Sequence, residues 1–185
     1  MALLDEIVDS IDHSREKRAR LANMLVANPT LIPELLGICA MVDDDASCRA
    51  AWGLEYMCKT KIDEILPYLD QLLTIIPTVY KHPAVRPMAK IIEQLMIHYY
   101  QKKEARTQQA LTKMHRSQIT EICFDWMITD QKVAVQAYTM TSLYLLGTEF
   151  DWVHAALKTI LENNYSKGSA AYKARSRMVL KKLRG

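Results

Sequence analysis

Glycine, proline and phenylalanine are scarce in this chain, which contains 5, 6 and 2 of them among 185 residues. Long runs of β-branched residues and glycine-rich phosphate loops are also missing. These shortages make collagen-like, disordered and β-sandwich structures poor interpretations. No apolar stretch approaches the roughly 18 residues that a membrane-spanning helix needs. With 50% of its residues hydrophobic, the chain is instead typical of a soluble helical domain with a sizeable core.

The chain also lacks the cysteine and histidine patterns of metal centres. Its four cysteines, none of them in a Cys-x-x-Cys pair, are Cys39, Cys48, Cys58 and Cys123. The histidines form no His-Glu-x-x-His motif, and no glycine-spaced calcium loop follows the acidic run 43–45. We therefore predict no metal and no cofactor. Reduced cysteines predict a cytoplasmic protein, and so do Asp5 and Glu6, which stand where a secretion signal needs positive charge. No membrane association is expected.

A helical pattern built around a small residue occurs four times along the chain. Its central alanines are Ala51, Ala89, Ala137 and Ala174. A small or apolar residue lies four positions before each alanine, and an apolar residue lies six positions after it. These offsets fall on one side of a helix with 3.6 residues per turn. The alanines are 38, 48 and 37 residues apart, which is the spacing of stacked helix pairs. We predict an all-α fold, an α-α superhelix of about four helix pairs.

The apolar periodicity also places the individual helices. An N-terminal helical cap, residues 1–28, contains helices over residues 3–11 and 14–27. The predicted pairs are 31–42 with 45–58, 62–80 with 84–100, 119–128 with 133–146, and 150–163 with 169–183. Pro67 and Pro77 are expected to bend or break the helix over 62–80. The polar segment 101–118 explains the 48-residue interval, and we interpret it as a mostly exposed insertion between repeats within one domain, residues 1–185.

Capping residues and glycine predict where some of these helices begin and end. Thr60 with Asp63, and Thr148 with Asp151, have the spacing of capping boxes, a hydroxyl followed three residues later by a carboxylate. Gly147 suits a left-handed position at a helix end. We therefore expect first helices to begin just after Thr60 and Thr148.

The segment 82–95 resembles the second helix of a HEAT repeat, in which a Val-Arg pair is followed three residues later by alanine. Val85, Arg86 and Ala89 match this pattern directly. The resemblance extends over residues 29–184 and implies a HEAT/ARM-like solenoid. The chain is also similar to short bacterial HEAT-like proteins, some of them labelled adenylosuccinate lyase. Gly168 and Ser169 match only the opening of the lyase loop, whose Met-Pro and Asn are missing here, so we predict no lyase activity.

The resemblance implies that the second helices line an inner surface, where aromatic and basic residues would gather. The candidate binding residues are Arg49, Trp52, Tyr56, Arg86, Lys90, Tyr138, Lys173, Arg175 and Arg177. Such groups stack on bases or peptides and pair with phosphates or carboxylates. In the alternative interpretation, the aromatic rings pack between neighbouring repeats and the cations are merely solvated.

Positive charge is concentrated at the C-terminal end. Residues 167–185 contain seven Lys or Arg residues and no acid. Because the whole chain carries +3 and this segment +7, the preceding 166 residues carry −4. The basic end is able to attract an anionic partner. It is equally explained as a solvated last helix whose cations lie near its negative dipole end.

These observations favour a non-enzymatic cytoplasmic scaffold that binds a protein or another anionic partner. The alternative is a DNA- or RNA-binding protein, because the chain is similar in size and type to HEAT-like DNA glycosylases that excise alkylated bases. Those enzymes need a carboxylate framed by aromatic rings. Trp52 with Glu55, and Asp125 with Trp126, supply these groups, but neither pair matches that family's site, so we assign no catalytic residue. The sequence leaves the partner and the oligomeric state open.

Overall fold

Helices account for all of the regular structure in residues 8–184, the part of the chain that the computed structural model describes. The α-helices are α2 (Arg15–Ala27), α3 (Ile32–Cys39), α4 (Asp45–Thr60), α5 (Leu69–Ile75), α6 (His82–Met96), α7 (Ala105–Ala110), α8 (Lys113–Ile128), α9 (Val133–Leu146), α10 (Asp151–Tyr165) and α11 (Ala170–Arg184). Three 3-10 segments and one π-helical segment join them: η1 (Pro29–Leu31), η2 (Ile62–Tyr68), η3 (Ile76–Thr78) and η4 (Ile97–Gln101). Because residues 8–184 contain no strand, the all-α prediction is confirmed. Asp5, Glu6 and the start of the predicted opening helix lie outside the described residues.

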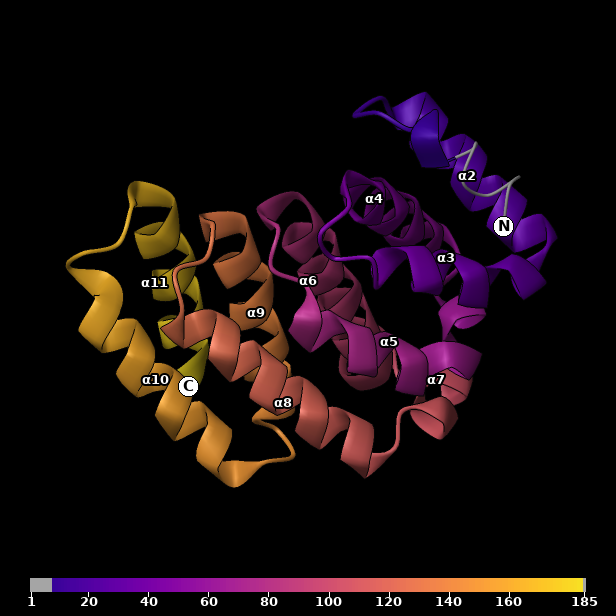
Figure 1. Cartoon of the computed structure of the whole chain (residues 1–185). Helices are drawn as coiled ribbons and strands as arrows, with labels where there is room; N and C mark the ends of the chain where they lie inside the picture. The colour runs from indigo at the N-terminus through magenta and orange to yellow at the C-terminus, as the bar shows by residue number, and fades with distance from the viewer. Residues whose placement is uncertain (1–7, 185) are drawn as a thin grey trace.

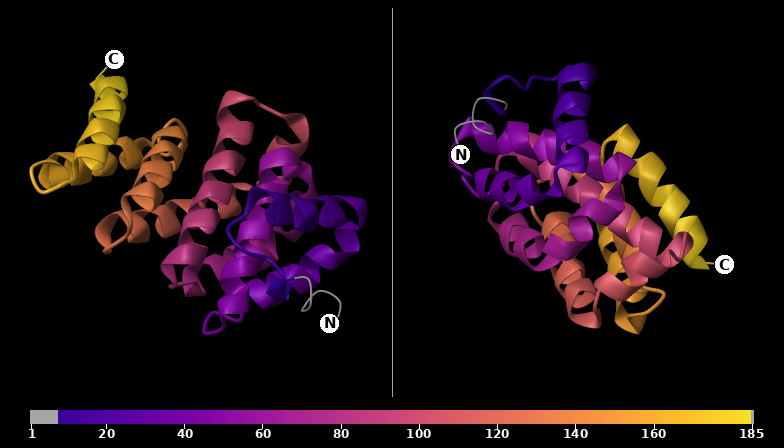
Figure 2. Two further views of the ribbon diagram at one scale, coloured as in Figure 1. Left: turned by 90° about the horizontal axis from the view of Figure 1, so that it is seen from above. Right: turned by 90° about the vertical axis from the view of Figure 1, so that its right-hand side faces the viewer.

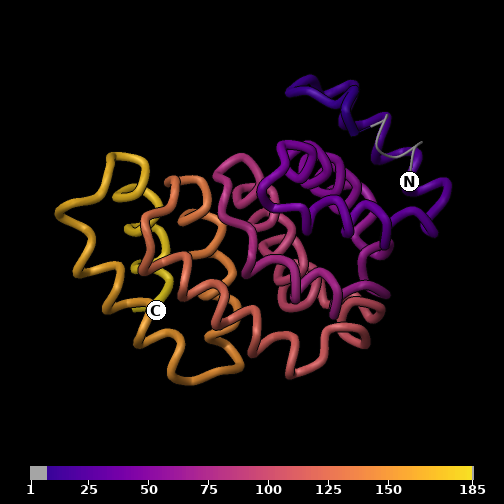
Figure 3. The backbone as a smooth tube through the Cα atoms, in the orientation of Figure 1, coloured from indigo at the N-terminus to yellow at the C-terminus, as the bar shows by residue number. Residues whose placement is uncertain are grey.

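The helices lie in two layers (Figure 1). In one layer α4 contacts α2 and α6, α6 contacts α9, and α9 contacts α11. In the other, α5 contacts α3 and α8, and α10 follows α8, with the rings of Phe124 and Trp152 stacked at 5.1 Å. The backbone passes repeatedly from one layer to the other (Figure 3), and α2 and α11 lie at opposite ends of the row (Figure 2). The HEAT-like superhelix remains a prediction.

The predicted alanine stripe is only half right. Ala51 and Ala89 are buried where α4 and α6 pack together. Ala137 is half-buried and Ala174 is exposed, so the stripe is wrong at the last helix. The buried residues of α11 are instead Tyr172, Ser176, Val179 and Leu180. Because α11 ends the described row and packs mainly against α9 and α10, a different side of this helix faces the core.

One hydrophobic cluster extends through the described chain, from Val8 to Leu180. All four cysteines are buried in it with free thiols. Burial disfavours the charged thiolate and raises the pKa of Cys39 to about 12. The thiols of Cys58 and Cys123 are shifted in the same direction for the same reason. These cysteines therefore act as small core residues, as their apolar helical surroundings indicate.

The expected break in the long helix over 62–80 is confirmed. This segment divides into η2, α5 and η3, with Pro67 inside η2 and Pro77 at the start of η3. A proline lacks the N–H that an α-helix needs at an interior position, so the chain tightens into 3-10 turns around both prolines.

Neither predicted capping box forms. Thr60 is the last residue of α4, and its hydroxyl donates to the carbonyl oxygen of Tyr56 at 3.2 Å. The hydroxyl of Thr148 donates to the carbonyl oxygen of Leu145 at 2.6 Å. The residue that caps α10 is Phe150, which makes no side-chain capping bond. Both threonines therefore close the preceding helix, because a nearby unpaired carbonyl at that helix end competes for the hydroxyl.

Gly147 is required for space rather than for a left-handed backbone. Its φ is −65°, so the left-handed prediction is wrong. A Cβ at this position would overlap the imidazole of His154. That ring stacks on Tyr144, with centroids 5.5 Å apart, and its Nε2 lies 2.8 Å from the Tyr144 carbonyl oxygen. The glycine therefore lets α10 approach the end of α9 closely.

The polar segment 101–118 forms α7 and the first residues of α8 rather than one separate helix. Because α8 begins at Lys113, the predicted start at Ile119 was six residues too late. Thr112 caps α8, since its hydroxyl accepts from the backbone N–H of His115 at 3.2 Å. Most side chains of the segment are exposed, as expected. Leu111 and Arg116 are buried, so the segment is anchored to the core.

Arg116 anchors this segment through a charged contact with Glu149. Its Nε lies 2.7 Å from Oε2 of that carboxylate and its Nη2 lies 2.7 Å from Oε1, while the Tyr100 hydroxyl donates to Oε2 at 2.6 Å. The guanidinium also lies over the Tyr99 ring, 4.4 Å from its centroid. Hydrogen bonds from Arg116 lower the pKa of Glu149, while burial raises the pKa of Tyr100. The bidentate geometry of the Arg116–Glu149 contact makes this a strong ion pair.

Candidate binding surface

Two of the predicted binding residues, Lys90 and Arg175, contact one buried carboxylate, that of Glu93 on α6. Glu93 is 4% exposed. Lys90 Nζ lies 2.6 Å from Glu93 Oε2, and Arg175 Nη2 lies 3.5 Å from Oε1. The same Lys90 ammonium lies 4.5 Å from the centroid of the Tyr138 ring. We call Lys90, Glu93, Tyr138 and Arg175 the Glu93 cluster. It joins α6, α9 and α11.

The contacts of the Glu93 cluster stabilise the fold and leave little of its charge available to a ligand. A buried carboxylate needs compensating positive charge, and Lys90 and Arg175 supply it. Arg175 also donates from Nε to the carbonyl oxygen of Ala137 at 3.4 Å, and from Nη2 to the hydroxyl of Thr141. Both cations are therefore largely committed to contacts within the protein.

The predicted arginines of α4 and α6 are engaged in the same way. Arg86 pairs with Glu55 at 3.3 Å, which ties α6 to α4. Arg49 donates to the carbonyl oxygen of Val8 at 3.1 Å and pairs with Asp9 at 2.6 Å. These arginines hold neighbouring segments together, so they contribute little unpaired positive charge.

The predicted aromatic residues of α4 contact neighbouring segments as well. Trp52 Nε1 donates to the carbonyl oxygen of Pro83 at 2.8 Å, and its ring lies 4.5 Å from that of His13. Arg15 Nε donates to the Tyr56 hydroxyl at 3.3 Å, a hydrogen bond that lowers the pKa of Tyr56. For these two residues the structure agrees with the interpretation that aromatic rings pack between repeats.

In each of the two aromatic–acid pairs considered for base excision, Trp52 with Glu55 and Trp126 with Asp125, the ring and the carboxylate lie in different surroundings. The ring of Trp52 faces His13, whereas the carboxylate of Glu55 faces Arg86. In the second pair, Trp126 is buried while Asp125 is exposed. Within residues 8–184 no group of three or more His, Cys, Asp or Glu side chains is arranged to hold a metal ion.

The basic residues of α11 differ from those on α4 and α6. In the described chain, the side chains of four of them make no hydrogen bond, ion pair or ring contact: Lys173, Arg177, Lys181 and Arg184. Lys182 lies over the Tyr144 ring, 5.3 Å from its centroid. Arg177, Lys181 and Arg184 are exposed and follow one another at intervals of four and three residues. They therefore lie along one side of α11.

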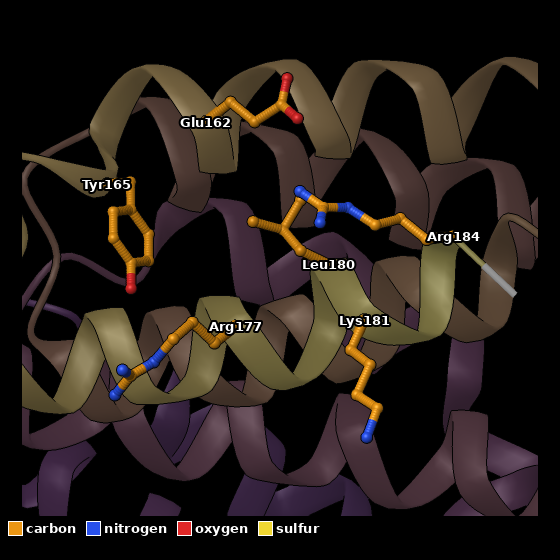
Figure 4. A pocket seen from close by; sticks show the side chains of 6 residues that line it. All are labelled: Glu162, Tyr165, Arg177, Leu180, Lys181 and Arg184. Carbon is orange, nitrogen blue, oxygen red and sulfur yellow. The ribbon is translucent and has the colours of Figure 1, made fainter.

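These three cations border a groove between α10 and α11, with a volume of about 490 Å³ (Figure 4). Its lining residues are Glu162 and Tyr165 of α10 and Arg177, Leu180, Lys181 and Arg184 of α11. Leu180 lies between the two helices, and the Tyr165 ring projects toward α11. Glu162 extends from the opposite side to the cations. We call this the α10–α11 groove. Its chemistry is apolar along the floor, basic along one edge and acidic at one point on the other.

The nine predicted binding residues include one of the six groove residues, Arg177. The prediction missed the acids that pair with three of the others, Arg49, Lys90 and Arg175. A weak signal for Glu93 exists, because it lies three positions after Lys90 on the same helix and Glu is rarely buried without a partner. For Tyr165 and Glu162 no such signal exists, because they belong to a first helix, which was not expected to reach a binding surface.

Comparison of this chain with protein-family models, curated proteins and solved structures finds no match. The HEAT-like resemblance, the function and the partner class therefore remain predictions. Among residues 8–184 no single helix is both long and apolar enough to cross a membrane. A pair bent by 109°, Arg15–Ala27 with Pro29–Cys39, meets the length and composition requirement when its two halves are taken together.

Proposed function

We propose that this protein is a non-enzymatic binding scaffold, built as a HEAT-like solenoid, that holds an anionic protein partner on its C-terminal helix. The observation that carries the proposal is the contrast between paired and unpaired cations. Arg49, Arg86, Lys90 and Arg175 all contact acids of the same chain. The exposed cations of α11 contact none among the described residues. Unpaired, solvent-facing charges keep their full attraction for a partner.

An anionic protein fits this surface better than nucleic acid does. A nucleic-acid backbone calls for a continuous path of positive charge. Here Glu55 on α4 and Glu93 on α6 pair with the cations that such a path would need. The α10–α11 groove offers Leu180 and the Tyr165 ring beside its cations, and apolar groups of this kind are buried at the centre of protein interfaces.

The test is binding of a fluorescein-labelled polyglutamate peptide, measured by fluorescence anisotropy. We expect affinity to fall as salt rises from about 50 mM to about 200 mM, because exposed charges are screened. The double variant Arg177→Glu/Lys181→Glu is expected to weaken binding at least about tenfold. The matched control is Arg20→Glu/Lys59→Glu, which changes the net charge equally at exposed positions on α2 and α4 whose side chains make no hydrogen bond or ion pair in the described chain.

Three outcomes would contradict the proposal. The first is that protein whose circular dichroism shows it to be folded binds neither polyglutamate nor any other acidic peptide tested. The second is an equal loss of binding in the control variant, which would mean that net charge and not α11 is responsible. The third is tighter binding of duplex or single-stranded DNA than of polyglutamate, which would favour the nucleic-acid alternative.

A further inference from the structure

The α10–α11 groove is the position where a further helix would pack. Each earlier groove in the stack is covered by the elements that follow. On the preceding pair, Phe124 of α8 stacks on Trp152 of α10 at 5.1 Å, and Met140 Sδ of α9 lies 4.0 Å from the Ser176 hydroxyl of α11. No described element covers the corresponding groove between α10 and α11. Its shape is therefore that of a groove into which a helix can pack.

The chemistry along the groove specifies which kind of helix. Arg177, Lys181 and Arg184 extend over eight residues of α11, whose seven rises of about 1.5 Å give roughly 10 Å of helix. A partner helix with carboxylates at matching intervals of three and four residues would face all three cations. Leu180 and the Tyr165 ring lie between α10 and α11 and form an apolar floor that an aliphatic ridge would cover. Arg184 extends past Leu180 toward α10, while Lys181 points away from α10 (Figure 4).

Glu162 adds a negative charge to the otherwise basic groove and so makes it selective among acidic partners. It projects from α10, across the groove from the cations. A partner negative on every side would place an acid against Glu162, and like charges in contact disfavour the complex. A helix with an acidic edge, an apolar ridge and a basic or neutral opposite edge avoids that repulsion. The groove therefore favours an amphipathic segment over a uniform polyanion.

We propose that the α10–α11 groove binds an acidic amphipathic α-helix of a partner protein, with an aliphatic ridge over Leu180 and carboxylates facing Arg177, Lys181 and Arg184. This inference rests on the proposed function, anionic-partner binding by α11, and adds the shape and chemistry of the partner segment. Helix-in-groove recognition of this kind uses apolar anchors at intervals of three and four residues.

The experiment compares two synthetic peptides of identical composition and charge, each titrated into the intact protein. In the first, Leu residues repeat every three and four positions with Glu along one flank and Lys along the other. In the second, the same residues are scrambled so that no apolar ridge exists. We expect the amphipathic peptide to bind at least about tenfold more tightly than the scrambled one. Its circular dichroism is expected to become helical on binding.

Two variants locate the binding site. Tyr165→Ala removes part of the apolar floor. We expect it to lower the affinity for the amphipathic peptide several-fold while leaving polyglutamate binding unchanged. Glu162→Lys removes the acidic point, and we expect it to reduce the preference of the protein for the amphipathic peptide over polyglutamate. Both residues lie outside the core cluster of fully buried side chains, and circular dichroism of the free variants checks that they fold.

Equal affinity for the two peptides would overturn the inference while leaving the proposed function intact, because charge alone would then explain binding. Failure of polyglutamate and of both peptides would overturn the proposed function together with the inference. A concentration-dependent dimer, detected by sedimentation and abolished by Tyr165→Ala, would also overturn it, since the occupant would then be a second copy of this chain.

Discussion

Arg175 on α11 contacts Glu93 on α6, with 3.5 Å between Nη2 and Oε1, although α9 lies between these two helices. The two residues are 82 positions apart in the chain. Lys90 approaches the other oxygen of the same carboxylate at 2.6 Å. One buried acid thus links α6 to α11, two helices of the row that are not adjacent, and two cations that resembled ligand-binding groups have a structural role.

The first prediction concerns this contact. Lys90→Met is expected to destabilise the protein by about 1–3 kcal/mol, because it leaves Glu93 buried with a weaker partner. Glu93→Gln in the Lys90→Met background is expected to restore part of that loss, since the uncompensated charge is gone. Urea unfolding measures both effects. Lys59→Met, at an exposed position whose side chain makes no hydrogen bond or ion pair among the described residues, serves as control and is expected to change stability by less than about 0.5 kcal/mol. Additive effects of the two Glu93-cluster substitutions would contradict the coupling.

The second prediction concerns pH. Hydrogen bonds from Arg116 lower the pKa of Glu149 below its usual value of 4.5. A depressed folded-state pKa means that the carboxylate stabilises the protein above its unfolded pKa, and that this contribution is lost as pH falls through the folded pKa. Glu149→Gln is therefore expected to reduce the unfolding free energy at neutral pH by about 1–3 kcal/mol. The difference from wild type is expected to shrink below about pH 4.5.

Urea titrations at a series of pH values check this expectation. The control is Glu162→Gln, because Glu162 makes no ion pair among the described residues. A Glu149→Gln deficit that stayed constant down to pH values well below the usual glutamate pKa would show that Arg116 does not depress this pKa.

The third prediction concerns Gly147. Gly147→Ala is expected to destabilise the protein by about 1–3 kcal/mol, because the new methyl group would overlap the His154 ring and displace it from Tyr144. The double variant Gly147→Ala/His154→Ala is expected to lose less stability than the sum of the two single variants, because the overlap is removed. Thermal unfolding of the four proteins gives the comparison. Gly37→Ala is the control, since a Cβ there would meet no atom within 4 Å.

The fourth prediction concerns the cysteines. Cys39, Cys58 and Cys123 are buried, and burial raises the pKa of each thiol. Because only the thiolate reacts readily, we expect these three to resist a thiol-specific dye in the native protein and to react at once in denaturant. Mass spectrometry of the labelled peptides identifies each site. Fast labelling of Cys123 under native conditions would contradict the packing of α8.

Much of the fold is readable from local patterns. Apolar spacing placed most of the helices to within a few residues, and Pro67 and Pro77 marked the break around α5. The two capping-box errors share one physical origin. Thr60 and Thr148 were assigned to the following helix, but their hydroxyls bond to carbonyl oxygens of the preceding one. A hydroxyl between two helices has a choice of partners, and geometry decides between them.

The candidate binding surface was harder to predict. Of the nine candidate residues, Arg177 lies in the α10–α11 groove. Arg86, Lys90 and Arg175 instead form ion pairs with acids of the same chain. Residue type identifies a cation. Whether the cation is free depends on what is packed next to it.

Helix content, helix order and the excess of positive charge at the C-terminal end are properties of short stretches of chain, because backbone hydrogen bonding and side-chain periodicity act over a few residues. Pairing of charges acts between residues brought together by packing. Arg86 and Glu55 are 31 positions apart, and Arg175 and Glu93 are 82. Only the assembled layers separate the neutralised cations of α4 and α6 from the unpaired ones on α11, since burial and proximity exist only in the folded chain.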